Sequence, residues 1–158
     1  MIKRGSGGVR HILCFGNPLH GDDGFGPAVY RRLAELPQPG DLRLFDVGTP
    51  GLSALVLFQD CCEAVIVDAS APAGQPGRLR ELPASAIATE PTTVGHGHGV
   101  GFLLRALAAL PEAPPALRVV TAEAASVVSF RPGLSAPVAL AVERTVDLLR
   151  GYFEIEST

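Results

Sequence analysis

Several features that would assign this 158-residue chain to a common class are missing from its sequence. No apolar run approaches the ~20 residues that a membrane-spanning helix needs. The basic residues near the N-terminus are not followed by the apolar segment of a secretory signal. Lys and Arg form no block and the net charge is −3, so an electrostatic surface for nucleic acid is not expected. We therefore expect a soluble cytoplasmic monomer with neither a membrane nor a nucleic acid as its partner.

Cysteine is also scarce, and its spacing excludes two further classes. The three cysteines are Cys14, Cys61 and Cys62, an odd number without a C-x-x-C pair. Neither a disulfide framework nor a zinc knuckle is supported by this pattern. Cys14 lies in an apolar run and is expected to be a small core residue, whereas Cys61 and Cys62 are expected in a loop or at a helix end.

The apolar residues that are present predict an α/β protein with one domain, residues 1–158. Hydrophobic residues make up 47% of the chain and charged residues 18%, which favours a packed core. Apolar runs predict strands, and apolar residues at helical spacing predict helices. The expected strands are 9–16, 41–47, 64–68, 78–83 and 117–122, and the expected helices are 24–36, 51–60, 100–110 and 136–151.

This order of elements predicts a three-layer α/β/α sandwich around a mostly parallel five-stranded sheet. The strand 78–83 is expected to be antiparallel, because no helix separates it from the strand before it. Residues 84–99 are expected to form a loop and residues 152–158 a frayed tail. Ser135 is expected to cap the last helix.

Acidic residues follow two of the predicted strands, and histidines lie in a later loop. Asp22 and Asp23 come after the first strand, and Asp68 ends the third. Ligands of such sheets bind at the carboxyl ends of the strands, so these carboxylates should face one crevice, to which the 84–99 loop can bring His96 or His98. Carboxylate and imidazole together suit nickel, zinc, iron or manganese and do not select one of them.

Each of these residues also has an ordinary structural interpretation. Asp22 and Asp23 are suited to cap the helix that follows, and Asp68 to a turn at a strand end. His96 and His98 lie in a Gly-rich segment where solvated histidines are common. A nucleotide-binding domain is a further alternative, but the loop FGNPLHGDDGFG lacks the G-x-G-x-x-G pattern and puts two carboxylates where a pyrophosphate would have to approach.

Five segments of the chain together resemble the hydrogenase maturation proteases. The loop GNPLHGDDGFG is similar to the N-terminal signature of that family, in which G-N-x-L is followed by D-D or D-E and G-x-G. The family's later segments resemble, in order, FDVGTPG at 45–51, AVIVDAS at 64–70, HGVGFLL at 98–104 and PGLSAPV at 132–138. Two departures are an Asp at 23, where many members have Glu, and the missing proline within 122–130.

The resemblance implies a phosphorylase/hydrolase-like fold and a specific proteolytic activity. Members of the family remove the C-terminal extension of a nickel-loaded [NiFe]-hydrogenase large-subunit precursor. The family's metal-contacting residues correspond to Asp23, Asp68 and His98, of which Asp23 and Asp68 are the candidate catalytic groups. His96 also satisfies the bare H-x-x-G pattern. Nickel is implied as a component of the precursor and not as a permanent cofactor. A metallochaperone that cleaves nothing is the remaining alternative.

Overall fold

The computed structural model describes residues 8–49, 51–88, 99–126 and 130–157, and its centre is a five-stranded sheet. The strands are β1 (Arg10–Phe15), β2 (Leu42–Gly48), β3 (Glu63–Ser70), β4 (Leu79–Pro83) and β5 (Ala116–Glu123). Their order across the sheet is β2-β1-β3-β5-β4. Only β4 is antiparallel to its neighbour among these strands. The predicted fold class is confirmed.

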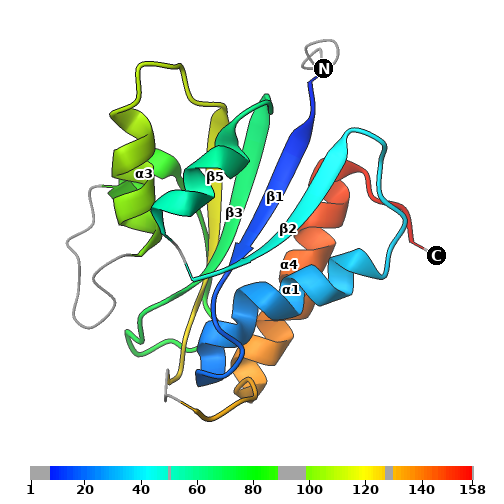
Figure 1. The fold of residues 1–158 in the computed structure, drawn as a ribbon. Helices are drawn as coiled ribbons and strands as arrows, with labels where there is room; N and C mark the ends of the chain where they lie inside the picture. Colours follow the sequence, from blue (N-terminus) through cyan, green and yellow to red (C-terminus); the bar gives the residue numbers. More distant parts are fainter. Residues whose placement is uncertain (1–7, 50, 89–98, 127–129, 158) are drawn as a thin grey trace.

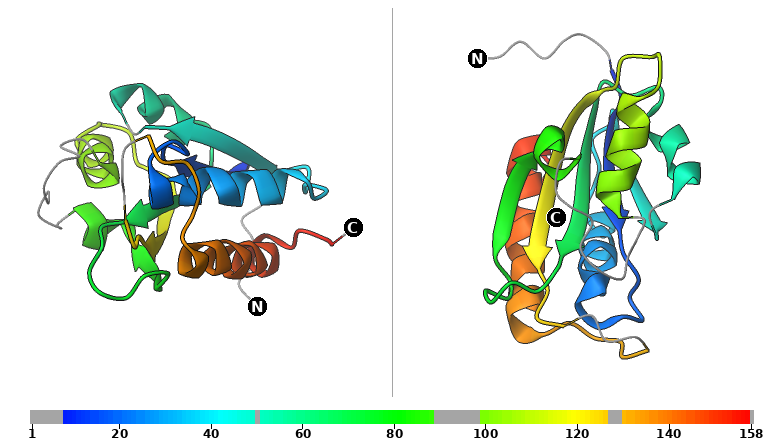
Figure 2. Two further views of the ribbon diagram at one scale, coloured as in Figure 1. Left: turned by 90° about the horizontal axis from the view of Figure 1, so that it is seen from below. Right: turned by 90° about the vertical axis from the view of Figure 1, so that its left-hand side faces the viewer.

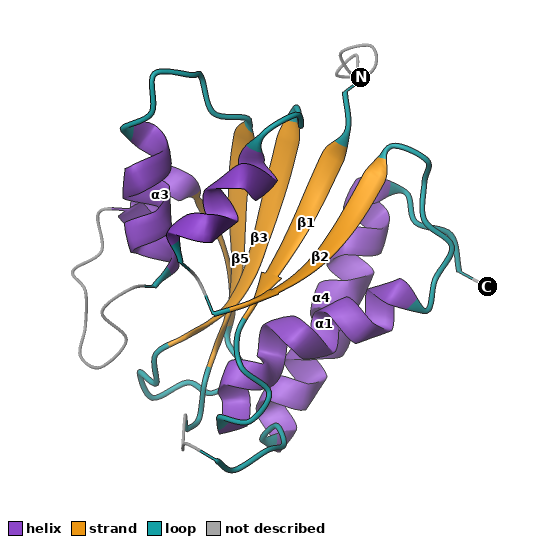
Figure 3. Cartoon of the chain, in the orientation of Figure 1, coloured by secondary structure: helices purple, strands orange, loops and turns teal. Residues whose placement is uncertain are grey.

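Helices cover both faces of the sheet (Figures 1 and 3). Buried apolar side chains form two separate cores, one on each face. The helices α1 (Phe25–Ala34) and α4 (Ala136–Phe153) lie on one face, and Figure 2 shows them together on one side of the strands. The opposite face carries the 3-10 helix η2 (Leu52–Phe58) and the helices α2 (Ala84–Ala88) and α3 (Val100–Ala108). Alternate residues of β1, β3 and β5 contribute to one core and then to the other.

A close approach between β1 and α1 depends on a glycine in the first turn of the helix. A Cβ atom on Gly26 would lie 2.0 Å from the carbonyl oxygen of Phe15, the last residue of β1. Gly16 is similarly constrained, because its φ is +135° and a Cβ there would lie 2.0 Å from the Asp23 carbonyl oxygen. These two glycines let the 16–24 loop fold tightly over the end of the strand.

Three predicted segments differ from the structure. Residues 84–88, expected in a loop, form α2, whose Ala84 and Ile87 pack against the core beneath α3. The short helix expected at 51–60 is a 3-10 helix that is limited to Leu52–Phe58. The expected frayed tail is wrong, because α4 continues to Phe153, and Phe153 and Ile155 are both buried in the core beside α1. Their burial stabilises a segment that terminal position alone predicted to be frayed.

No helix among the described residues is long and apolar enough to cross a membrane. Cys14 is fully buried in the core, as expected.

Two helical glycines, Gly26 in α1 and Gly151 in α4, provide a test of the close approach. We expect Gly26→Ala to lower the free energy of unfolding by about 1–3 kcal/mol, because the added Cβ would overlap backbone that cannot move freely. Gly151→Ala is the control: nothing lies within 4 Å of a Cβ there, so the higher helix propensity of Ala should raise stability by about 0.5–1 kcal/mol. Urea denaturation of both variants measures the two effects, and equal changes would contradict the assignment.

Candidate functional site

The candidate carboxylates lie where the direction of chain connection changes in the sheet. From β1 the chain passes to β2 on one side, and it then crosses to β3 on the other side of β1. Open α/β sheets bind ligands in the crevice at such a switch point. Pairing between β1 and β3 ends at Cys14 and Val67, so Asp68 is the first residue of β3 beyond its contact with β1. The loop that carries Asp23 begins at this point.

Asp23 is held in place by backbone groups of its own loop. It belongs to the 3-10 helix η1 (Gly21–Gly24), which directly precedes α1. Its Oδ2 atom accepts a hydrogen bond from the backbone N–H of Asn17 at 2.9 Å, and its own N–H bonds to the His20 carbonyl. The N–H of Gly16 bonds to the carbonyl oxygen of Gly48 at the end of β2, which fixes the start of the loop.

Asp68 lies in a less favourable electrostatic environment. Desolvation of its carboxyl group and, second, the nearby Asp23 carboxylate raise the pKa of Asp68 well above its usual range. A hydrogen bond from the N–H of Ala69 to Oδ1, at 2.9 Å, opposes this shift. Asp68 follows Ala64 and Ile66 on alternate positions of β3, so its side chain is on the sheet face covered by α3. Of the three carboxylates predicted to face one crevice, Asp23 and Asp68 are therefore electrostatic neighbours.

Asp22 has a different environment from Asp23, although the two are adjacent in sequence. Its residue is 2% exposed, and its carboxylate accepts bonds from the backbone N–H groups of Ala125, Ser126 and Ser135 and from the Ser135 hydroxyl. The donors belong to the segment between β5 and α4. In addition, the Gly21 N–H bonds to the Arg131 carbonyl. Asp22 thus joins the loop after β1 to the loop after β5.

The predicted helix caps at these positions are wrong. The N-cap of α1 is Gly24, and no side chain bonds to the first turn of that helix. The reason is the intervening turn η1, which directs the Asp22 carboxylate toward the β5–α4 segment. Ser135 is the N-cap residue of α4, as expected, but its side chain makes no capping hydrogen bond, and its hydroxyl donates to Asp22. Sequence reasoning missed this role of Asp22 because its partners are more than 100 residues away in the chain.

The candidate histidines His96 and His98 lie outside the described residues. The description resumes at Gly99, the N-cap of α3. The end of α3 leads to the start of β5 at the opposite edge of the sheet, so the first turn of α3 is directed toward the edge that carries Asp23 and Asp68 (Figure 1). Within the described ranges, no three His, Cys, Asp or Glu residues lie close enough together to hold a metal. His11 of β1 has a structural role, since its Nδ1 atom lies 2.7 Å from the carbonyl oxygen of Leu57 in η2.

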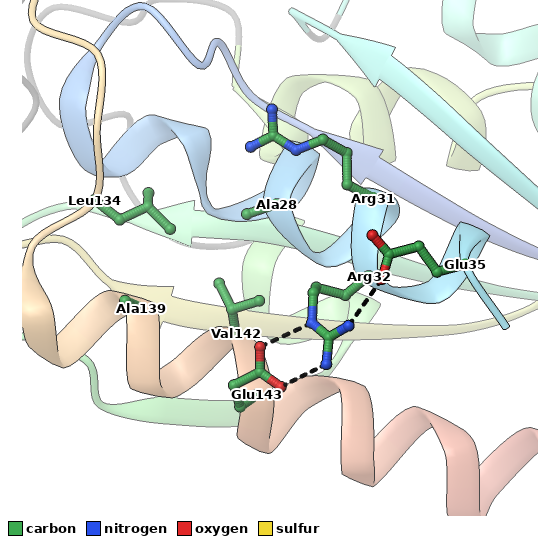
Figure 4. Close-up of a pocket in the computed structure, with 8 residues that line it drawn as sticks. All are labelled: Ala28, Arg31, Arg32, Glu35, Leu134, Ala139, Val142 and Glu143. Atoms are coloured by element: carbon green, nitrogen blue, oxygen red, sulfur yellow. Dashed lines mark hydrogen bonds and ion pairs between the residues drawn. The ribbon is translucent and has the colours of Figure 1, made fainter. Parts of the chain in front are cut away.

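A separate hollow between α1 and α4 lies on the other face of the sheet (Figure 4). It has a volume of about 320 Å³, and none of the candidate residues lines it. Arg32 of α1 forms ion pairs here with Glu143 of α4 and Glu35. These exposed pairs connect the two helices, and we assign the hollow no part in the candidate site.

The fold and the neighbouring carboxylates Asp23 and Asp68 define the class: an α/β protein with an acidic site at the switch point of its sheet. The sequence model of the hydrogenase maturation proteases (HycI) matches residues 27–151, a range that includes Asp68 and begins four residues after Asp23. The chain therefore belongs to the hydrogenase maturation protease family, a family of peptidases.

Individual relatives agree with this assignment over nearly the whole chain. A protein of Methanocaldococcus jannaschii, provisionally named a hydrogenase maturation protease, is 26% identical over 144 residues, which are 89% of this chain and 93% of that protein. The structure is similar to the hydrogenase 2 maturation peptidase of Thaumarchaeota archaeon SCGC_AB-539-E09, with 25% identity, a TM-score of 0.69 and coverage of 94% and 99% of the two chains. The hydrogenase maturating endopeptidase HybD of E. coli shares the fold, with 22% identity, a TM-score of 0.75 and 92% of each chain covered.

The buried carboxylate of Asp22 should dominate the stability of this edge. We expect Asp22→Ala to lower the free energy of unfolding by about 3–5 kcal/mol, because it leaves several buried donors without an acceptor. Ser135→Ala removes only one donor and should cost about 1–2 kcal/mol. Urea denaturation of the two variants gives the comparison, and equal losses would show that the backbone bonds to Asp22 contribute little.

Proposed function

We propose that the protein is an endopeptidase that removes the C-terminal extension of a nickel-loaded [NiFe]-hydrogenase large-subunit precursor. In this proposal, Asp23, Asp68 and His98 contact the nickel of the precursor. The observation that carries the proposal is the pair of neighbouring carboxylates at the switch point of a fold shared with maturation proteases. The metal belongs to the substrate, so the enzyme needs no cofactor of its own.

The electrostatics of the carboxylate pair support the binding of a cation. Asp23 raises the pKa of Asp68, which means that the two negative charges repel each other in a poorly solvated position. A divalent cation between them would replace this repulsion with attraction. Carboxylates combined with one imidazole suit a metal of intermediate hardness such as nickel, although they do not by themselves distinguish it from zinc, iron or manganese.

The same groups account for a hydrolytic step. In the proposed reaction, one carboxylate accepts a proton from a water molecule, and the oxygen of that water attacks the carbonyl carbon of the scissile peptide bond. The C–N bond then breaks, and the amine of the released extension takes up the proton. The contact of Asp23 and Asp68 with the nickel places the water next to the carbonyl carbon of the scissile peptide bond. A positioned metal also lowers the pKa of bound water. Their rigid supports, the Asn17 and Ala69 N–H groups, keep both carboxylates oriented.

The first test compares cleavage of nickel-loaded and nickel-free precursor, read as the mass of the large subunit. We expect the protein to release a C-terminal peptide from the loaded form only. Asp68→Asn should slow this release by more than the ~10–100-fold that is typical of residues that merely support a metal ligand. The variant should unfold at the same or a higher temperature, because it removes a desolvated charge beside Asp23. Asp68→Asn protein that cleaved at the normal rate would disprove the assignment.

The two histidines of the G-H-G-H-G segment allow a matched comparison. We expect His98→Ala to abolish release of the extension, because it removes the imidazole that binds the nickel, and His96→Ala to leave the rate within about threefold. The same mass measurement on nickel-loaded precursor distinguishes them. The reverse result would transfer the role to His96, and full activity of both variants would exclude an imidazole contact from this segment.

A further inference from the structure

Thr121 of β5 has a buried hydroxyl group without a hydrogen-bond partner. The residue is 5% exposed, and among the described residues its Oγ1 atom meets no donor or acceptor. Buried polar side chains in native proteins nearly always have a partner, so each exception calls for an explanation. The neighbouring residues Val119 and Val120 show that this strand accommodates valine, which has almost the shape of threonine and no hydroxyl.

The position of Thr121 in the sheet relates this hydroxyl to the candidate site. Thr121 is paired in register with Asp68 of β3 on one side and with Arg80 of β4 on the other. Register partners point to the same face, and Val119, two residues earlier, packs in the core under α3. Thr121 and Asp68 are therefore neighbours on the face that α3 covers, at the carboxyl edge of the sheet.

Of these two flanking residues, only Asp68 can accept a hydrogen bond that the Thr121 hydroxyl donates. A guanidinium group has donors only, so Arg80 cannot accept a hydrogen bond from the Thr121 hydroxyl. A carboxylate can accept several hydrogen bonds. The Ala69 N–H donates one to Oδ1 of Asp68, which leaves acceptor capacity on that carboxylate for the Thr121 hydroxyl. Adjacent strands are ~4.8 Å apart, so rotation about side-chain torsions brings the hydroxyl and the carboxylate into contact. Hydrogen bonds of catalytic sites are often open without substrate and close in the complex.

We propose that Thr121 is a positioning residue, whose hydroxyl donates a hydrogen bond to the Asp68 carboxylate when that carboxylate binds the metal-loaded precursor. This inference rests on the proposed function. Carboxylates that bind a metal are usually held by a further hydrogen bond, which fixes the oxygen that faces the metal. Thr121 would supply that bond from β5, an interior strand that is paired on both sides.

The test measures release of the C-terminal extension from nickel-loaded precursor, together with the thermal unfolding midpoint of each variant. We expect Thr121→Val to slow release ~10–100-fold without lowering the unfolding midpoint, because the change removes an unpaired buried hydroxyl and keeps the shape. Thr121→Ser, which keeps the hydroxyl, should retain a rate within about threefold of the original. Thr145→Val is the matched control: Thr145 is also buried, but its hydroxyl bonds to the Ala141 carbonyl within α4, and its loss should leave the rate unchanged.

Each other outcome overturns the inference in a distinguishable way. Thr121→Val protein that works at the original rate excludes a role for the hydroxyl while the proposed function stands. Equal loss in the Val and Ser variants would assign the effect to shape. If Thr121→Val unfolds at a much lower temperature, the comparison of Thr121→Ala with Thr121→Ser separates hydroxyl from packing. If the unmodified protein releases nothing from loaded precursor, the proposed function and the role of Thr121 both fail.

Discussion

The carboxylate of Asp22 is the contact on which the carboxyl edge of the sheet depends. It is almost fully buried and accepts four hydrogen bonds from the segment between β5 and α4. A buried charge is tolerable only when it is satisfied in this way. Because Asp23 is the next residue, the bonds that fix Asp22 also fix the backbone that carries Asp23. The two adjacent acids therefore differ in role. Asp22 is a structural carboxylate that is saturated by hydrogen-bond donors, whereas the proposed function assigns Asp23 to binding.

Two features of the candidate site lower the stability of the folded protein. Asp68 is desolvated and lies within the field of Asp23, and a buried hydroxyl without a partner lies beside it in register. An asparagine at 68 and a valine at 121 would each relieve one of these costs without changing the fold. Features that break local rules in an otherwise consistent structure are expected where function requires them. The concentration of two such features at one strand edge is the physical reason for assigning the site there.

The sequence predicted the parts of this structure that depend on local pattern. Apolar runs identified all five strands, and the rule for parallel sheets predicted that Asp23 and Asp68 lie at one edge. The failures have a common cause in contacts between distant segments. The role of Asp22 depends on Ser135, and the burial of Phe153 depends on a core assembled from several elements. Thr121 was predicted only as part of a buried strand, although its period-two spacing from Val119 already set its face.

The proposed function gives the repulsion between Asp23 and Asp68 a use in selecting the substrate. A site that bound free metal tightly would be occupied continuously and could not report whether the precursor had been loaded. With only two carboxylates and one imidazole, and no thiolate, the proposed site would hold a free ion weakly. A nickel ion that arrives already held by the precursor adds the binding free energy of the surrounding polypeptide to that weak attraction. An empty precursor would leave the carboxylate repulsion uncompensated, so the same two charges would favour the loaded form and disfavour the empty one.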